Sequence, residues 1–132
     1  MAEAYFRRLL EENGRSQDIC VSSAGLGTFG NDAVSENSVL VMKEIGLDIS
    51  GHASAPLLRE QAKEAAYIIC LSRSHYDALV PILGAEKLRL LGQGIDDPFG
   101  QDEAVYRRVR DQIIEACDKL YGEIIHDDRT NE

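Results

Sequence analysis

The chain has 132 residues, the size of one ordinary domain, and its 44% of apolar residues can form a real core. The net charge of −9 argues against nucleic acid and anionic membranes as partners, because both attract positively charged surfaces. No apolar run approaches the roughly 20 residues of a membrane span, and no basic, apolar leader opens the sequence. We therefore expect a cytoplasmic protein whose three cysteines, Cys20, Cys70 and Cys117, are free thiols.

The first third of the chain predicts a helix, a strand and a second helix. An apolar stripe of helical spacing begins at Ala2, and Asn13-Gly14 ends this helix, although no capping residue precedes it. A short strand is expected over residues 18–23, followed by a glycine-rich stretch. The second helix is expected over residues 35–45, and its inward-facing side chains would be Val39, Leu40 and Met42.

The rest of the chain alternates helices and strands. The expected elements are a helix over 57–64, a buried strand over 65–71, a helix over 74–83 that Pro81 loosens, a strand over 87–91 and a loop over 92–100. The clearest element is a final helix from about Asp102 to Tyr121. Asp102 is its expected N-cap, and Glu103 and Arg107 form a favourable pair.

Strands that alternate with helices predict a doubly wound α/β fold, in which helices cover both faces of a parallel sheet. Three strands are visible, which is few for this architecture. We expect a single domain over residues 1–125, followed by a frayed polar tail over residues 126–132. The histidines have no metal-ligand spacing, so we expect no metal and no cofactor; they are His52, His75 and His126.

Gly25, Gly27 and Gly30 form a G-x-G-x-x-G pattern between an expected strand and an expected helix. Such a loop can bind a dinucleotide, because glycines let the backbone approach a pyrophosphate at a helix N-terminus. However, the next strand begins near Ala65, too far on for a compact unit of ~30 residues, and no acidic residue stands where the ribose contact belongs. We favour a flexible glycine loop.

Asp97-Pro98 is the candidate for chemistry. Proline restricts the residue before it to extended backbone, so the Asp97 carboxylate has a fixed position at the mouth of the sheet. Such a carboxylate can serve as a general acid that protonates a leaving oxygen. Asp-Pro is also common in turns, and the dipeptide by itself favours a plain turn.

Landmarks along the whole chain carry a resemblance to one family. They are Met-Ala-Glu-Ala-Tyr-Phe at the start, Ser-Ala-Gly at 23–25, Gly-Leu-Asp-Ile-Ser-Gly-His at 46–52, Tyr-Ile-Ile-Cys-Leu at 67–71, Asp-Pro-Phe-Gly at 97–100 and Ala-Val-Tyr at 104–106. In this order the chain resembles the low-molecular-weight protein-tyrosine phosphatase family, which also contains bacterial protein-arginine phosphatases and related arsenate reductases.

The resemblance implies a four-stranded parallel sheet and a phosphorylated protein substrate. In the family, the cysteine of a C-x5-R-S loop after the first strand is the nucleophile and forms a phosphocysteine. The arginine and the loop amides hold the phosphoryl oxygens. By the match at Asp97-Pro98, Asp97 would be the general acid, and Phe99 would form a wall of the substrate cleft.

The sequence departs from the family at its start, because Met1 falls where the family has the methionine just after that loop. No cysteine of the chain has an arginine five or six residues later. We therefore expect no significant phosphatase activity from the chain itself. Two interpretations remain: a phosphatase with a wrong start or a shortened chain, which we favour, and a natural non-catalytic relative that binds or regulates a partner.

The absence of the family's first strand and loop also bears on which substrate the chain would take and on how it would assemble. Phosphotyrosine and phosphoarginine both stay open as substrates, whereas the arsenate-reductase branch needs further cysteines and residues 72–89 contain none. In the family the absent strand lies between those that match residues 19–23 and 65–71. We therefore expect a rearranged three-stranded sheet or self-association through unpaired strand edges.

Overall fold

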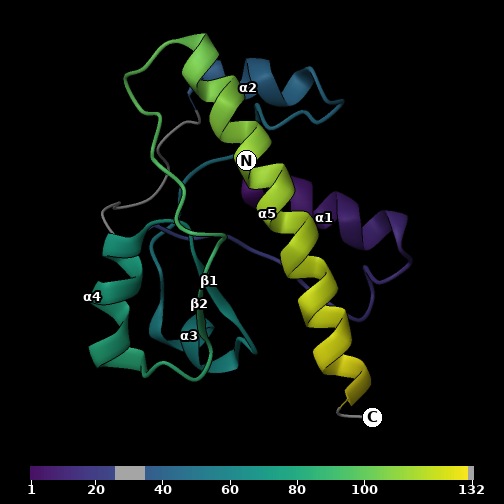
Figure 1. Cartoon of the computed structure of the whole chain (residues 1–132), viewed down its shortest axis with the longest axis vertical. Coiled ribbons are helices and arrows are strands. Elements are labelled where there is room, and N and C mark those ends of the chain that lie inside the picture. The colour runs from purple at the N-terminus through teal and green to yellow at the C-terminus, as the bar shows by residue number, and fades with distance from the viewer. Residues whose placement is uncertain (26–34, 131–132) are drawn as a thin grey trace.

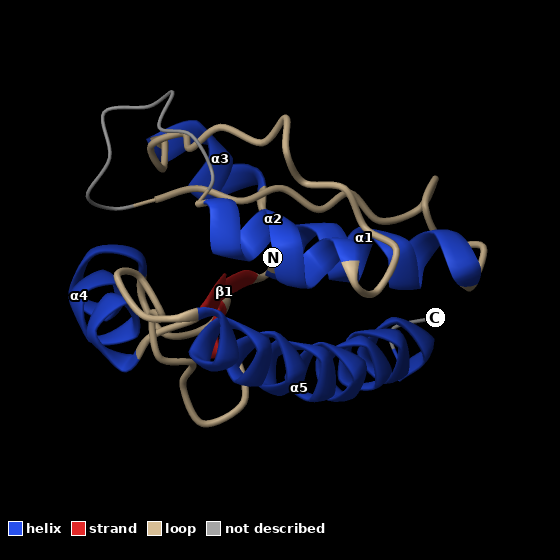
Figure 2. Ribbon diagram, turned by 90° about the horizontal axis from the view of Figure 1, so that it is seen from above, coloured by secondary structure: helices blue, strands red, loops and turns tan. Residues whose placement is uncertain are grey.

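The computed structural model describes residues 1–25 and 35–130. Its elements are α1 (Ala2–Glu12), α2 (Glu36–Lys43), α3 (Arg59–Glu64), β1 (Ile68–Cys70), α4 (Arg73–Leu83), β2 (Leu88–Leu90) and α5 (Glu103–Thr130). Figure 1 shows the two strands between α4 on one side and α1 with α5 on the other. Seen from above in Figure 2, α5 lies along the side of α1 and α2 and contacts both. The fold is therefore layered, with helices on both sides of the strands.

All five predicted helices are present, and capping side chains explain where three of them begin. At the start of α2, Ser35 Oγ accepts a hydrogen bond from the Ser38 N–H at 3.2 Å. Ser72 Oγ accepts a hydrogen bond from the His75 N–H at 3.2 Å, so α4 begins one residue earlier than predicted. Pro81 lies inside α4 near its end and does not interrupt it. Asp102 Oδ1 accepts a hydrogen bond from the Val105 N–H at 3.1 Å, which confirms Asp102 as the N-cap of α5.

The helix α5 is longer than the sequence predicted. The predicted end near Tyr121 is wrong, because the backbone is helical to Thr130, whereas the frayed tail predicted over residues 126–132 stays a prediction. Ile124 is 7% exposed and packs on the core, so the apolar side of the helix still has a partner there. No glycine or proline occurs in residues 123–130 to end the helix. Within the described ranges, no helix is both long and apolar enough to cross a membrane.

The sheet formed by the described residues has two strands rather than the three predicted. β1 and β2 pair in parallel, with Ile69 opposite Arg89, so the predicted α/β class is confirmed. The strand predicted over residues 18–23 is wrong, because this segment is irregular backbone. A strand exists only where a neighbouring strand takes up its N–H and C=O groups, and no strand of the described residues pairs with this segment. The alternation of apolar residues over 18–23 was therefore not enough by itself to predict a strand.

Two hydrophobic clusters join the layers. The larger one lies between α1 and α5 and includes Leu10, Leu91 and Ile113, each at most 2% exposed. The smaller one joins the sheet to α4 through Cys70, Leu79 and Leu88. Because close-packed side chains of these clusters include residues at the ends of both strands, the strand ends are held in place.

The buried face of α2 differs by one position from the predicted one. Leu40, predicted to face inward, is 43% exposed, whereas Val41 and Met42 are 0% and 1% exposed. Val39 is half-buried and packs on the larger cluster. The rotation of α2 follows its packing on α5, where Arg110 donates a hydrogen bond to the Val41 carbonyl.

Candidate active site

Residues 92–101 connect β2 to α5, and we call them the acid loop. Two backbone hydrogen bonds attach its start to the end of β1. The Leu91 N–H donates to the Cys70 carbonyl at 2.8 Å, and the Ile95 N–H donates to the Leu71 carbonyl at 2.6 Å. The loop is therefore anchored where the parallel strands end, which is the edge at which open α/β sheets bind ligands.

Asp97 is exposed in a tight turn of the acid loop. Its Oδ1 accepts a hydrogen bond from the Phe99 N–H at 3.0 Å, and the Gln101 N–H donates to the Pro98 carbonyl at 2.9 Å. The turn predicted from Asp-Pro is thus confirmed. The same turn fixes the carboxylate at the surface, and no cationic side chain of the described residues pairs with it. The turn at Asp97-Pro98 therefore leaves the Asp97 carboxylate exposed at the surface.

Phe99 is 79% exposed, more than any other large hydrophobic side chain in residues 1–25 and 35–130. It follows the buried Pro98, so the backbone of the loop is held inward while the ring is held outward. The exposed Phe99 ring offers a ligand an apolar face two residues along the chain from the Asp97 carboxylate.

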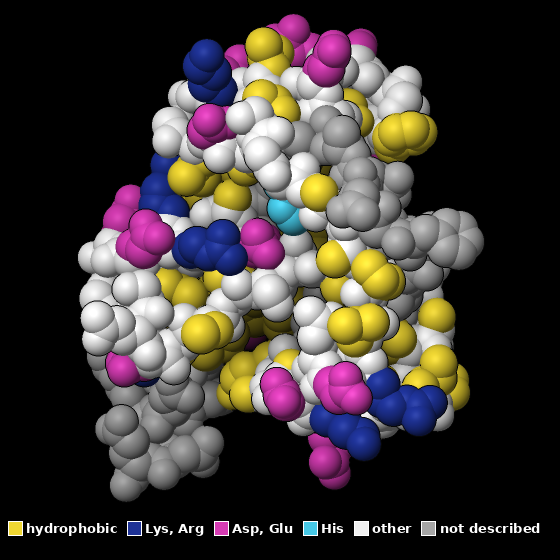
Figure 3. Space-filling model, turned by 180° about the vertical axis from the view of Figure 1, so that it is seen from behind, with side chains coloured by type: hydrophobic (Ala, Val, Ile, Leu, Met, Phe, Trp, Pro, Cys, Tyr) yellow, Lys and Arg dark blue, Asp and Glu magenta, His cyan; other side chains and the backbone are white. Residues whose placement is uncertain are grey.

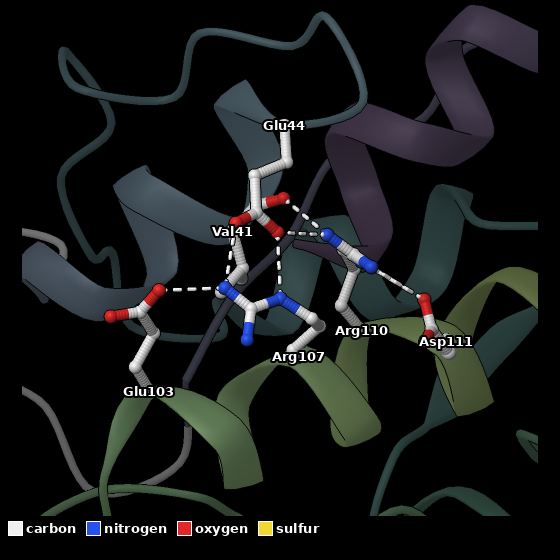
Figure 4. A network of polar contacts seen from close by, with 6 residues as sticks. All are labelled: Val41, Glu44, Glu103, Arg107, Arg110 and Asp111. Atoms are coloured by element: carbon white, nitrogen blue, oxygen red, sulfur yellow. Dashed lines mark hydrogen bonds and ion pairs between the residues drawn. The ribbon is translucent and has the colours of Figure 1, made fainter.

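A group of charged side chains, which we call the arginine clamp, joins α2 to α5 (Figure 4). Arg107 Nε and Nη2 donate to the two carboxylate oxygens of Glu44 at 2.9 and 2.6 Å. Nη2 also donates to Glu103 at 2.6 Å, which confirms the pair predicted from the sequence. The bidentate contact fixes the direction as well as the distance of the Glu44 carboxylate.

Arg110 is the buried member of the clamp, with a side chain that is 10% exposed. Its Nη1 donates to Glu44 at 2.7 Å and to the Val41 carbonyl at 2.9 Å. Its Nε and Nη2 donate to Asp111 at 3.0 and 2.9 Å. Every guanidinium nitrogen therefore has a partner, as a buried charge requires.

The clamp also holds the second end of the acid loop. It acts on the first two turns of α5, directly after the loop, and the Asn37 side-chain amide of α2 donates to the Gln101 carbonyl at 3.3 Å. Sequence reasoning missed Glu44 and Arg110, because Glu44 precedes Arg107 by 63 residues and no local pattern links them. The acid loop is thus held by β1 at its start and by α2 at its end.

The clamp predicts an acid-sensitive contribution to stability. Hydrogen bonds from Arg107, together with those from Arg110, lower the pKa of Glu44 from 4.5 to about 2. Because the folded pKa lies below the unfolded one, this contribution is complete above about pH 4.5 and is lost as the pH falls toward 2. Urea unfolding across this window should show Glu44→Gln to be less acid-sensitive than the unchanged chain. Equal pH dependence of the two proteins would contradict the assignment.

Glu3 brings together three landmarks that lie far apart in the sequence. Ser23 Oγ donates to Glu3 at 3.1 Å, Arg7 pairs with Glu3 at 3.5 Å, and His52 Nδ1 lies 4.0 Å from the same carboxylate. A pocket of about 160 Å³ adjoins this cluster; its lining residues are Ser23, Ala24, Gly25, His52, Ser54 and Ala55. Sequence reasoning named these segments as separate landmarks and did not predict their contact.

The remaining sequence motifs give no second site. Gly27 and Gly30 of the glycine pattern lie outside the described residues, and Gly25 forms an isolated parallel bridge with Pro56. In the part of the chain that the structure describes, no three or more His, Cys, Asp or Glu side chains gather as a metal site would require.

The three thiols have different environments. Cys20 is exposed, whereas Cys70 and Cys117 are buried. Burial raises the pKa of Cys70, and burial with the neighbouring Asp118 carboxylate raises the pKa of Cys117 to about 12. Cys70 and Cys117 are therefore protonated at neutral pH, and the prediction that Cys70 is a buried structural cysteine is confirmed.

These environments predict one fast thiol among three. At pH 8 we expect a disulfide reagent such as Ellman's reagent to react rapidly with Cys20 and slowly with Cys70 and Cys117, because the thiolate is the reactive form. The fast phase should disappear in Cys20→Ser and should persist in Cys117→Ser. A second fast phase in the folded chain would show that one of the buried thiols is activated.

Comparison with known proteins addresses the family directly. Residues 1–130 match the family described as low molecular weight phosphotyrosine protein phosphatase. Arsenate reductase 1 of Staphylococcus epidermidis is 34% identical over 118 residues, which cover 89% of this chain and 82% of that protein. The arsenate reductase of Brevibacillus brevis is 35% identical over 113 residues, covering 86% and 77% of the two chains.

Solved structures agree with the sequence match. A low molecular weight protein tyrosine phosphatase from T. tengcongensis has a TM-score of 0.85 at 27% identity and covers 92% of this chain and 88% of its own. The YwlE arginine phosphatase from Geobacillus stearothermophilus has a TM-score of 0.84 at 26% identity, covering 99% and 87%. Sequence and fold thus agree over nearly the whole chain, and this protein belongs to the low molecular weight phosphotyrosine protein phosphatase family.

Proposed function

We propose that this chain carries the acid part of a phosphatase site, with Asp97 as the general acid and Phe99 as a wall of the substrate cleft. Membership in a family of phosphotyrosine protein phosphatases supports this assignment. The observation that carries it is the exposed Asp97 carboxylate, held by the Phe99 N–H on a loop anchored at the ends of parallel strands. A carboxylic acid in such a position can protonate the oxygen of a leaving group.

We also propose that the chain by itself has no significant phosphatase activity. Phosphoryl transfer to a thiol needs a thiolate and positive groups around the phosphoryl oxygens. The residues six positions after the three cysteines are Leu26, Tyr76 and Glu123, so the sequence contains no C-x5-R loop. Because nucleophile and phosphate-binding groups act as a unit, Asp97 does not replace them.

Phosphorylated proteins, rather than arsenate, are the proposed substrates of a completed site. Two curated relatives are named arsenate reductases at 34% and 35% identity. Reduction through a cysteine relay requires more than one thiol that can exchange, yet residues 72–89 contain no cysteine, and with Cys70 and Cys117 buried only Cys20 is exposed. The similar solved structures include a tyrosine and an arginine phosphatase, so we retain phosphotyrosine and phosphoarginine as candidates.

A fusion tests the proposal. A strand followed by a C-x5-R-S-P loop from a family member is joined directly before Met1. We expect the fusion to hydrolyse p-nitrophenyl phosphate and the chain alone to remain at background, because only the fusion has a nucleophile. The matched control is the same fusion with serine in place of the loop cysteine, which should be inactive. Hydrolysis by the chain alone that Asp97→Ala abolishes would refute the proposed inactivity.

The second candidate function is that of a non-catalytic relative that binds or regulates a partner. The exposure of Phe99, at 79%, favours it, because an apolar ring at the surface can bind without any chemistry. The DNA directly upstream of the first codon separates the two candidates: an in-frame strand ending in C-x5-R-S-P favours the phosphatase. Self-association through an unpaired strand edge is compatible with both and forms part of either proposal.

A further inference from the structure

The acid loop crosses between two parts of the molecule. On the face shown in Figure 3, a hollow separates the part built on α1 and α5 from the part built on the strands and α4. The loop leaves β2 in the second part and ends at the start of α5 in the first part (Figure 1). The position of Asp97 therefore depends on how both ends of the loop are held.

The two ends of the acid loop are held in different ways. At the first end, the Ile95 N–H donates to the Leu71 carbonyl, and the Ile95 side chain is buried in the larger cluster. At the second end, Gly100 and Gln101 are exposed. Apart from its chain neighbours, no described residue has a heavy atom within 4 Å of where a Cβ on Gly100 would lie. Packing therefore does not hold this end, so its position depends on hydrogen bonds.

Gln101 is the residue through which the second end is held. Its N–H donates to the Pro98 carbonyl at 2.9 Å, which closes the turn. Its carbonyl precedes α5, and the Val105 N–H, four residues on, donates to Asp102 Oδ1. The carbonyl is thus left for a donor from another element, and the Asn37 side-chain amide donates to it at 3.3 Å. Gln101 therefore connects Asn37 of α2 directly to the turn of the acid loop.

Asn37 shares one face of α2 with the residues that bind α5. Asn37, Val41 and Glu44 follow one another at steps of four and three residues, the spacing of a single helix face. The Val41 carbonyl accepts from Arg110, and the Glu44 carboxylate accepts from Arg107. Because the arginine clamp fixes α2 on α5, it also fixes the place where Asn37 meets the loop.

We propose that Asn37 is a positioning residue for the acid, which holds the Gln101 carbonyl and so keeps the Asp97 carboxylate where a leaving oxygen can take its proton. This inference rests on the proposed acid role of Asp97. Asn37 acts through Gln101 and the turn, and not on the substrate. A catalytic group misplaced by about 1 Å can cost as much as about 10²-fold in rate. Loss of the Asn37 donor should therefore slow proton delivery and leave substrate binding intact.

The first test uses the full chain. Asn37→Asp removes the donor and nearly preserves the size of the side chain, and a carboxylate in the first turn of α2 suits the helix dipole. We expect hydrogen exchange of the Gln101 and Phe99 amides to become at least threefold faster, while the Ile95 amide at the first end is unchanged. Glu36→Gln, at the exposed position directly before Asn37, is the matched control and should change none of the three. Unchanged exchange at Gln101 in Asn37→Asp would overturn the proposal.

The second test uses the fusion that carries the C-x5-R-S-P loop. We expect Asn37→Asp to lower kcat for phenyl phosphate about tenfold and to change KM less than twofold. The loss should be less than threefold with p-nitrophenyl phosphate, whose leaving group needs little protonation. The double variant Asn37→Asp, Asp97→Asn should be no slower than Asp97→Asn alone, because the acid through which Asn37 acts is then absent. Glu36→Gln should change kcat less than twofold with either substrate.

The outcomes separate a positioning role from a merely structural one. Additive losses in the double variant, or equal losses with the two substrates, would overturn the proposal, because damage to the fold slows both substrates alike. A loss in Asp97→Asn without a loss in Asn37→Asp would overturn the role of Asn37 alone. A fusion that Asp97→Asn does not slow would overturn the acid role of Asp97 and the role of Asn37 with it.

Discussion

Replacing Asp97 by asparagine in the fusion that carries the C-x5-R-S-P loop is expected to lower kcat for phenyl phosphate about 10²- to 10⁴-fold. Asparagine keeps an oxygen that can accept the Phe99 N–H, so the turn of the acid loop is retained. Only the proton that reaches the leaving oxygen is lost. The measurement is steady-state hydrolysis, with the far-ultraviolet circular dichroism spectrum confirming that the fold is unchanged.

Asp96→Asn is the matched control, because Asp96 is the exposed carboxylate directly before Asp97 and has no proline after it. We expect it to change kcat less than about threefold. The leaving group provides a second check: p-nitrophenol leaves without much protonation, so the loss caused by Asp97→Asn should be smaller with p-nitrophenyl phosphate. An equal loss from the two substitutions, or no dependence on the leaving group, would rule out Asp97 as the acid.

Arg110→Ala is expected to lower the free energy of unfolding by about 2–4 kcal/mol. It removes a buried charged side chain and leaves the groups that bonded to it without those hydrogen bonds. The Val41 carbonyl, buried between α2 and α5, would lose its guanidinium donor. Glu44 would keep only the more exposed Arg107. Urea unfolding followed by circular dichroism measures the loss.

Arg107→Ala is the control for position and charge. It removes the same charge from the same helix, yet its side chain is 38% exposed against 10% for Arg110, so solvent already screens its pairs. We expect a much smaller loss of stability than for Arg110→Ala. Equal losses of stability from the two substitutions would show that burial does not determine the contribution of Arg110 to the free energy of unfolding.

Local chemistry made much of the candidate site readable from the sequence. The Asp102 cap, the Glu103–Arg107 pair and the turn at Asp97-Pro98 each depend on residues within four positions of one another, and the structure contains all of them. The family resemblance rested on short motifs in a fixed order, and the match over residues 1–130 confirms it. The catalytic roles of Asp97 and Phe99 remain predictions.

The sequence by itself determined the five helices, the α/β class and the family, because helical periodicity, capping and motif order are properties of neighbouring residues. Only the tertiary structure decided the strand at residues 18–23, which is absent among the described residues because a strand needs a partner beside it. It also decided the length of α5, through the packing of Ile124. The arginine clamp belongs here too, since Glu44 meets Arg107 across 63 residues only when α2 packs on α5.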